Sequence, residues 1–185
     1  MTEPERYGLH KWFVERLGTA GDALHMFATA ATAMVVSGTA ALVLKQPLLF
    51  PSLGPTLYLF FETLMARQTS PRNALIGHFV ALVVGFLSVW AFGLLHAPSV
   101  IEQGATPARV GAAALSLALT EALLILLRAE HAPAGATVLI VSLGLLSTPG
   151  RVLVMAASIV LLTVTGWIIN RLCGVPMPLW SSHHG

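Results

Sequence analysis

The chain has 185 residues, of which 56% are apolar and only 10% are charged, and its mean hydropathy is +0.80. A soluble domain carries about 25% charged residues because water must solvate its surface, so this composition excludes a soluble globular protein. The net charge of +2 comes from scattered cations rather than a basic stripe, which excludes a nucleic-acid-binding protein.

The first 22 residues form a mixed, amphipathic N-terminal segment. Tyr7, Trp12 and Phe13 alternate with charged residues, a pattern typical of a short helix lying in the membrane interface. A solvated tail is the alternative. We assign residues 1–22 to a cytoplasmic or interfacial segment, 23–172 to a transmembrane domain and 173–185 to a C-terminal tail.

About six hydrophobic segments are expected. A helix that crosses ~30 Å of hydrocarbon needs about 20 apolar residues. Four stretches reach that length: Leu24–Leu44, Asn73–Leu95, Ala108–Leu127 and Val152–Asn170. Two others are apolar but short, Gly54–Ala66 and Ala134–Ser147, and each follows prolines, so each is expected to be half of a broken helix or a re-entrant segment. The predicted fold class is an all-α polytopic membrane protein.

The cations predict the orientation of these segments. If all six cross, one face holds seven Lys or Arg residues and the other holds three. The positive-inside rule then places both termini in the cytoplasm, and we expect a bacterial inner membrane. The seven are Arg6, Lys11, Arg16, Arg67, Arg72, Arg128 and Arg171; the three are Lys45, Arg109 and Arg151.

Small residues recur at helical spacing in several segments, which predicts faces where helix backbones approach closely in lipid. One such stripe contains Gly77, Ala81 and Gly85. Two more are expected on the first and fourth segments: Ala28 with Thr32, and Ala114 with Ala118 and Ala122.

The two halves of the hydrophobic region repeat one pattern. Gly54 matches Gly135, and Thr56 matches Thr137, both 81 residues apart. Each short segment ends in a polar turn, Ser-Pro-Arg-Asn at 70–73 and Thr-Pro-Gly-Arg at 148–151. Since each unit has three segments, the second copy is expected upside down relative to the first, and transporters with such repeats bind substrate at the breaks.

The breaks themselves suggest a polar site within the membrane. Lipid offers no partner to backbone amides exposed at a break, and the N-terminus of the following half-helix attracts anions. Gly54 and Gly135 permit a tight turn and a close ligand approach. The alternative is that both breaks are only bends packed against protein.

A family resemblance rests on three stretches of the chain. His-Ala-Pro-Ala-Gly-Ala-Thr at 131–137 resembles the His-Pro-Pro-Ala-Gly-Ala motif that names the HPP family of integral membrane proteins. Pro-Arg-Asn at 71–73, followed by Gly-His at 77–78, is similar to that family's Pro-Arg-Asn and Gly-His stretch. Leu-Gly-Pro-Thr at 53–56 stands where the family has a Phe-Gly-Ala-Ser type sequence. The resemblance covers about residues 25–172, and Ala132 replaces the first motif proline.

Some HPP members of chloroplasts and cyanobacteria are linked to nitrite transport, so the resemblance implies a transporter or channel for a small anion such as nitrite. The candidate substrate-binding residues lie at the two breaks and in the third segment: Ser52, Gly54, Thr56, His78, His131, Gly135 and Thr137. Carboxylates expected to be buried, together with polar residues after the short segments, are candidates for proton coupling or anion attraction: Glu62, Arg72, Asn73, Glu121 and Arg151.

Two other functions remain open. One is a membrane-embedded structural or sensory subunit that transports nothing. The other is a haem-binding subunit, because five histidines lie in or near the segments: His10, His25, His78, His96 and His131. No nucleophile elbow, Walker loop, metal-ligand spacing or dinucleotide fingerprint is present, so neither an enzyme nor a cofactor is predicted. Because the chain is small, we expect a homo-oligomer in the lipid bilayer.

Overall fold

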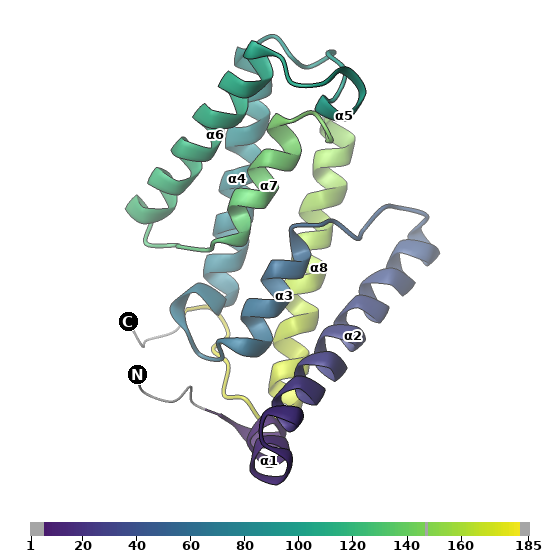
Figure 1. Cartoon of the computed structure of the whole chain (residues 1–185), viewed down its shortest axis with the longest axis vertical. Coiled ribbons are helices and arrows are strands. Elements are labelled where there is room, and N and C mark those ends of the chain that lie inside the picture. Colours follow the sequence, from purple (N-terminus) through teal and green to yellow (C-terminus); the bar gives the residue numbers. More distant parts are fainter. Residues whose placement is uncertain (1–5, 147, 182–185) are drawn as a thin grey trace.

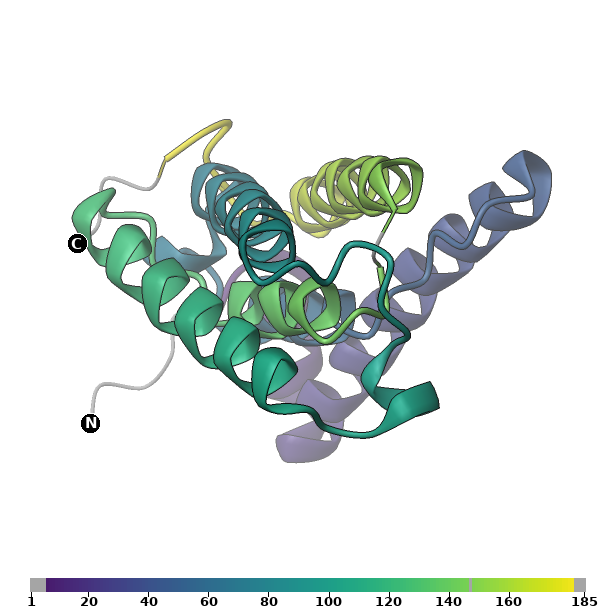
Figure 2. The ribbon, with the colours of Figure 1, turned by 90° about the horizontal axis from the view of Figure 1, so that it is seen from above.

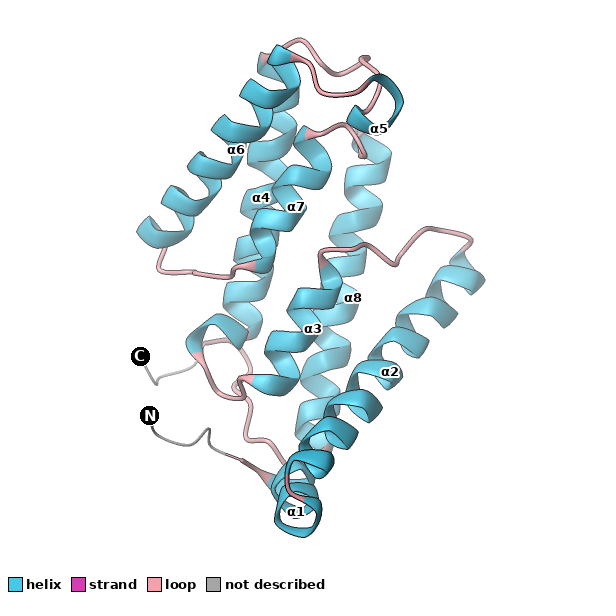
Figure 3. Cartoon of the chain, viewed as in Figure 1, coloured by secondary structure: helices cyan, strands magenta, loops and turns pink. Residues whose placement is uncertain are grey.

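A computed structural model describes residues 6–146 and 148–181, and every regular element in these ranges is helical (Figures 1 and 3). The predicted all-α class is therefore confirmed. Residues 1–5 and 182–185 of the expected terminal segments, and the expected segment end at Ser147, lie outside the described residues.

The described ranges contain eight α-helices and one short 3-10 helix. Their bounds are α1 Gly8–Leu17, α2 Thr19–Leu44, α3 Leu53–Glu62, η1 Arg67–Thr69, α4 Pro71–Ala91, α5 Val100–Gln103, α6 Pro107–Leu126, α7 Pro133–Ser142 and α8 Pro149–Leu172. The short helix expected in the amphipathic N-terminal segment is present as α1. The first long helix begins at Thr19, earlier than the expected Leu24, because α2 runs on into the amphipathic segment.

Four of these helices, α2, α4, α6 and α8, are long and apolar enough to cross a membrane. Helices α3 and α7 have ten residues each, so at 1.5 Å per residue each covers about 15 Å, half of the hydrocarbon. We call α3 and α7 the half-helices. Proline follows the break in both cases, at Pro55 and at Pro133, where its missing N–H costs nothing in a first turn.

The two units α2–α3–α4 and α6–α7–α8 run in opposite directions, as the repeat predicted. Figure 1 shows α3 descending and α7 rising from the same level, so the N-termini of the half-helices face each other in the middle of the fold. Arg67 of η1 and Arg72, in the first turn of α4, donate to the carbonyl oxygen of Arg128 just beyond α6. The start of α4 and the end of α6 therefore lie close to each other.

Close packing of α4 against α7 places one half-helix at the centre of the bundle (Figure 2). A Cβ atom on Gly77 would lie 2.8 Å from the Cβ of His131, and one on Gly85 would lie 2.9 Å from the Cβ of Val141. Ala81, between them, is buried. The predicted Gly77–Gly85 stripe is thus a packing face that only small residues allow.

The other two expected stripes do not pack within the chain. Ala114, Ala118 and Ala122 are exposed on α6. On α2 the predicted Ala28 and Thr32 are exposed as well, and the buried residues lie one position further on: Gly21, His25, Thr29, Ala33 and Ser37. The spacing was correct, but composition does not reveal which face of a helix meets its neighbours.

The amino- and carboxyl-terminal segments meet at one end of the fold. The Leu9 amide donates to the Cys173 carbonyl, and the Arg72 amide donates to the Trp180 carbonyl. His10 Nε2 lies 2.7 Å from Asp22 Oδ1, which holds α1 against the start of α2. The C-terminal tail therefore folds back under α4 instead of leaving the molecule.

At the C-terminal end of each half-helix, a buried polar side chain of a long helix donates a hydrogen bond to a backbone carbonyl. The Asn170 amide of α8 donates to the Phe60 carbonyl near the end of α3. Arg109 of α6, only 2% exposed, donates to the Ser142 carbonyl at the end of α7 and to the carbonyls of Ala97 and Pro98. These contacts satisfy carbonyls that a helix end leaves open.

Arg109 should therefore stabilise the end of α7. We expect Arg109→Met to lower the free energy of unfolding by about 3 kcal/mol, because one buried and two partly buried carbonyls lose a charged donor. Denaturant titration of the purified protein in detergent measures the change. The matched variant Arg151→Met, at an exposed position, should shift it by about 0.5 kcal/mol or less. Equal effects of the two variants would contradict the role of Arg109.

Candidate functional site

Four polar side chains meet where the two breaks face each other. Thr56 comes from α3, His78 from α4, His131 from the loop before α7, and Thr137 from α7 itself. All four are buried, with at most 1% of each residue exposed. We call them the histidine–threonine cluster.

The cluster is joined by hydrogen bonds through both nitrogens of each imidazole. His78 Nε2 lies 2.8 Å from Thr56 Oγ1, and His78 Nδ1 lies 2.7 Å from Thr137 Oγ1. The two Nε2 atoms of His78 and His131 are 3.3 Å apart. His131 Nδ1 contacts the backbone carbonyl of Gln68 at 2.9 Å. The hydrogen bonds of the cluster thus involve only hydroxyl, carbonyl and imidazole groups.

Local sequence explains why these groups converge. Thr56 and Thr137 lie one turn inside the half-helices, so the repeat brings them to related positions. His78 follows Gly77, whose missing side chain makes room for His131. The predicted Asn73 contributes by donating from Nδ2 to the Glu130 carbonyl, which fixes the loop next to His131.

Two backbone amides at each break already have hydrogen-bond partners, contrary to the expectation of free amides. In the first break Leu53 and Gly54 donate to the carbonyls of Phe50 and Pro51; in the second, Ala134 and Gly135 donate to those of His131 and Ala132. Tight turns close these bonds because unpaired amides are costly in hydrocarbon. The polar groups of the site are therefore side chains instead of these backbone amides.

The remaining predicted substrate residues surround this cluster. Ser52 is fully buried, and its hydroxyl has no hydrogen-bond partner. Gly54 is exposed, with open space where a Cβ would point. Gly135 is buried, and a Cβ there would lie 3.2 Å from the Glu121 carboxylate oxygen.

A groove of about 530 Å³ runs between the half-helix N-termini. Its lining residues are mostly apolar: Gly54, Pro55, Tyr58, Leu59, Ala132, Pro133 and Ala136. Ala132 and Ala136 are neighbours of His131 and Thr137 in the sequence, but the four buried cluster side chains do not themselves line the groove.

The predicted proton-coupling carboxylates are not buried in the chain. Glu62, the last residue of α3, is exposed, and so is Glu121 on α6. The expectation of two buried carboxylates was wrong, because both lie on outward helix faces. Glu121 nevertheless reaches the first turn of α7 beside Gly135, where the helix dipole favours a negative charge.

The predicted arginines also lie outside the cluster. Arg72 donates to the carbonyls of Leu127 and Arg128 and to the Asn73 side chain, so its guanidinium caps the end of α6. Arg151 is exposed in the first turn of α8. Each therefore has a structural or peripheral position.

The geometry of the paired histidines does not suit haem. Axial imidazoles bind iron from opposite faces of the macrocycle, whereas His78 and His131 are in direct contact, with ring centroids 4.9 Å apart. Across residues 6–146 and 148–181 no group of three or more His, Cys, Asp or Glu side chains is placed to hold a metal ion.

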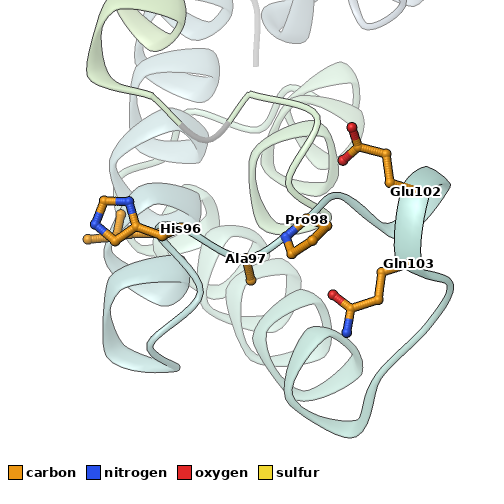
Figure 4. Close-up of a pocket in the computed structure, with 6 residues that line it drawn as sticks. His96, Ala97, Pro98, Glu102 and Gln103 are labelled. Carbon is orange, nitrogen blue, oxygen red and sulfur yellow. The ribbon is translucent and has the colours of Figure 1, made fainter.

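A second pocket, of about 620 Å³, lies at the connection between α4 and α6 (Figure 4). Glu102 and Gln103 line it from α5, and His96 lies on the other side of Ala97 and Pro98. Hydrogen bonds from the Ser99 backbone and hydroxyl lower the pKa of Glu102, which keeps this carboxylate charged. The pocket is therefore unsuited to an anion.

The comparison with protein families rests on most of the chain. A model of the family described as HPP, transmembrane region, matches residues 16–178. The chain belongs to the HPP family. The resemblance predicted from the breaks is thus confirmed, and in this HPP protein the family motif at residues 131–137 spans the turn before α7 and the first residues of that helix. No curated protein and no solved structure matches the chain.

Sequence reasoning missed two groups that shape the site. One is the Gln68 carbonyl, which receives the His131 hydrogen bond; a backbone atom of an ordinary loop residue leaves no signal in the sequence. The other is Arg109, counted only as a loop cation. No nearby acidic residue in the sequence indicates that its partners are carbonyls.

The bond between His78 and Thr137 should contribute to stability. We expect Thr137→Val to lower the free energy of unfolding by about 2 kcal/mol, because it leaves a buried imidazole nitrogen without a partner. Thr137→Ser keeps the hydroxyl and should cost clearly less. Denaturant titration in detergent compares the two, and a Thr137→Val protein as stable as Thr137→Ser would contradict the bond.

Proposed function

We propose that this HPP protein carries a small inorganic anion, of which nitrite is the first candidate, across the membrane, and that it catalyses no reaction. This proposal rests mainly on the buried histidine–threonine cluster between the two half-helix N-termini. Each half-helix directs the positive end of its dipole towards the middle of the fold, and inverted units of this kind bind substrates between them.

The cluster is suited to a weakly bound substrate. Hydroxyl and imidazole groups exchange hydrogen bonds without the strong fixed charge of an arginine, so a monoanion is held and released rather than trapped. A groove between the half-helix N-termini is lined by Ala132 and Ala136, the sequence neighbours of His131 and Thr137. The unpartnered Ser52 hydroxyl adds a further donor near the break.

We propose that both termini are cytoplasmic, in a bacterial inner membrane. The support is the excess of cations at one end of the fold. Arg67 and Arg72 lie there with Arg128, and Arg171 lies in the last turn of α8 at the same end as the tail. Loop cations of this kind favour the cytoplasmic side.

We also propose that the protein is a homo-oligomer, with α6 at the contact between copies. Ala114, Ala118 and Ala122 form an exposed stripe next to the exposed Glu121. A carboxylate on a membrane-crossing helix is costly against lipid, and small residues allow a second helix to approach.

Replacement of a small residue on this stripe should weaken association. We expect Ala118→Phe to lower the share of oligomer in native mass spectra at least several-fold, because a bulky ring separates the helix backbones. Ala40→Phe on the half-buried face of α2 is the control. A purely monomeric unmodified protein would contradict the proposal.

The transport proposal is tested by flux into proteoliposomes. We expect labelled nitrite to enter at least ten-fold faster than into empty vesicles. Gly54→Leu should remove most of this flux without lowering the melting temperature, since its side chain enters open space in the groove.

Gly150→Leu is the matched control, because a Cβ at Gly150 also meets nothing within 4 Å but lies in the first turn of α8. Its flux should equal that of the unmodified protein. If nitrite, nitrate, formate and bicarbonate all fail to enter, the transport proposal is wrong. A structural or sensory subunit would then be favoured, and it would tolerate Gly54→Leu and purify with protein partners.

A further inference from the structure

The hydrogen bonds of the cluster determine where its protons reside. A carbonyl oxygen only accepts, so His131 Nδ1 must donate to the Gln68 carbonyl. A neutral His131 therefore has a bare Nε2, which accepts. Thr56 Oγ1 lies 3.2 Å from the Ser52 carbonyl and donates to it for the same reason.

These two donors fix the tautomer of His78. Its Nε2 lies next to two acceptors, Thr56 Oγ1 at 2.8 Å and His131 Nε2 at 3.3 Å, so Nε2 carries the hydrogen. His78 Nδ1 is then bare and accepts from the Thr137 hydroxyl. The remaining contact, between Thr56 Oγ1 and His131 Nε2, is the longest at 3.4 Å and joins two acceptors. Both imidazoles are neutral, with one proton between the two Nε2 atoms.

One further proton fits this arrangement without breaking a bond. If it binds His78 Nδ1, the Thr137 oxygen changes from donor to acceptor and its hydroxyl hydrogen becomes free. The proton between the Nε2 atoms stays in place. A second added proton would put N–H groups on both Nε2 atoms at 3.3 Å, which abolishes their hydrogen bond.

The singly protonated cluster is a buried cation, which is costly without a counter-charge. The nearby arginine side chains lie outside the cluster, so they add little repulsion to its positive charge. Arg67 and Arg72 donate to carbonyls at the end of α6, and Arg128 is exposed. The carboxylates that face it from neighbouring elements are exposed too, Glu121 on α6 and Glu130 beside His131. An anion in the groove, which is lined by the sequence neighbours Ala132 and Ala136 of His131 and Thr137, would balance this charge.

We propose that the His78–His131 pair takes up one proton for each anion bound, so that the substrate is a monoanion that crosses together with a proton. This inference rests on the proposed transport function. Proton and anion each stabilise the other, and they leave together. On entry an O–H bond of hydronium in the water on one side breaks as the N–H bond forms at His78 Nδ1, and on release that N–H bond breaks and the proton passes to water on the other side. Nitrite and formate are monoanions and fit this class.

The resting state is tested by NMR of the full protein in nanodiscs with isotope-labelled histidine, assigned with His78→Gln and His131→Gln. Without substrate we expect opposite tautomers, with the hydrogen on Nε2 of His78 and on Nδ1 of His131. Addition of nitrite should shift the His78 signals towards the doubly protonated form. The same tautomer on both residues, or no shift with a transported anion, would overturn the inference.

The coupling is tested in proteoliposomes that report nitrite and internal pH together. We expect one proton to enter with each nitrite, at a rate unaffected by a membrane potential. His78→Gln should lose proton-coupled uptake at least ten-fold, while His96→Gln, at an exposed position in the α4–α6 connection, should not change it.

The outcomes separate the two proposals. Nitrite flux that is driven by the potential and brings in no proton would overturn proton coupling and leave the transport function intact. Equal uptake of nitrate or chloride without protons would do the same. Absence of flux for every anion tested would overturn transport itself, and the coupling that rests on it.

Discussion

Hydrocarbon offers no hydrogen-bond partner, and this constraint governs the whole fold. Two interrupted helices inside a membrane expose polar backbone that the protein itself must satisfy. In tight turns, the first amides of α3 and α7 donate to carbonyls just before each helix. At the C-terminal ends of these half-helices, Asn170 and Arg109 donate to carbonyls. Arg72 does the same at the end of α6. Long helices thus provide, from opposite sides, the partners that water would provide in a soluble protein.

The inverted repeat follows from the same constraint. A half-helix covers only part of the hydrocarbon, and a second one entering from the other side completes the layer. Their N-termini then face each other, and the threonines one turn inside both of them, Thr56 and Thr137, lie on either side of His78. The small residues Gly77 and Gly85 of α4 allow this approach. Packing, polarity and the proposed substrate path therefore depend on one another.

Much of the site was predictable because each signal was local. Proline and glycine marked the breaks, and the depth of His78 within an apolar segment marked it as an interior residue. The same reasoning predicted the wrong burial for two carboxylates. Glu62 and Glu121 lie in equally apolar sequence, but they are on outward helix faces. Helical spacing shows which residues share one face of a helix. Whether that face is buried depends on neighbouring helices from distant parts of the chain.

The sequence by itself determined the membrane class, the four long and two short segments, and the repeat with its candidate residues, because length, hydropathy and helix-breaking residues act locally. Only the tertiary structure decided that His78 and His131 touch, that the Gln68 carbonyl orients His131, and that Arg109 is buried among carbonyls. Those contacts join residues far apart in the chain, and their hydrogen bonds depend on distances that no linear pattern contains.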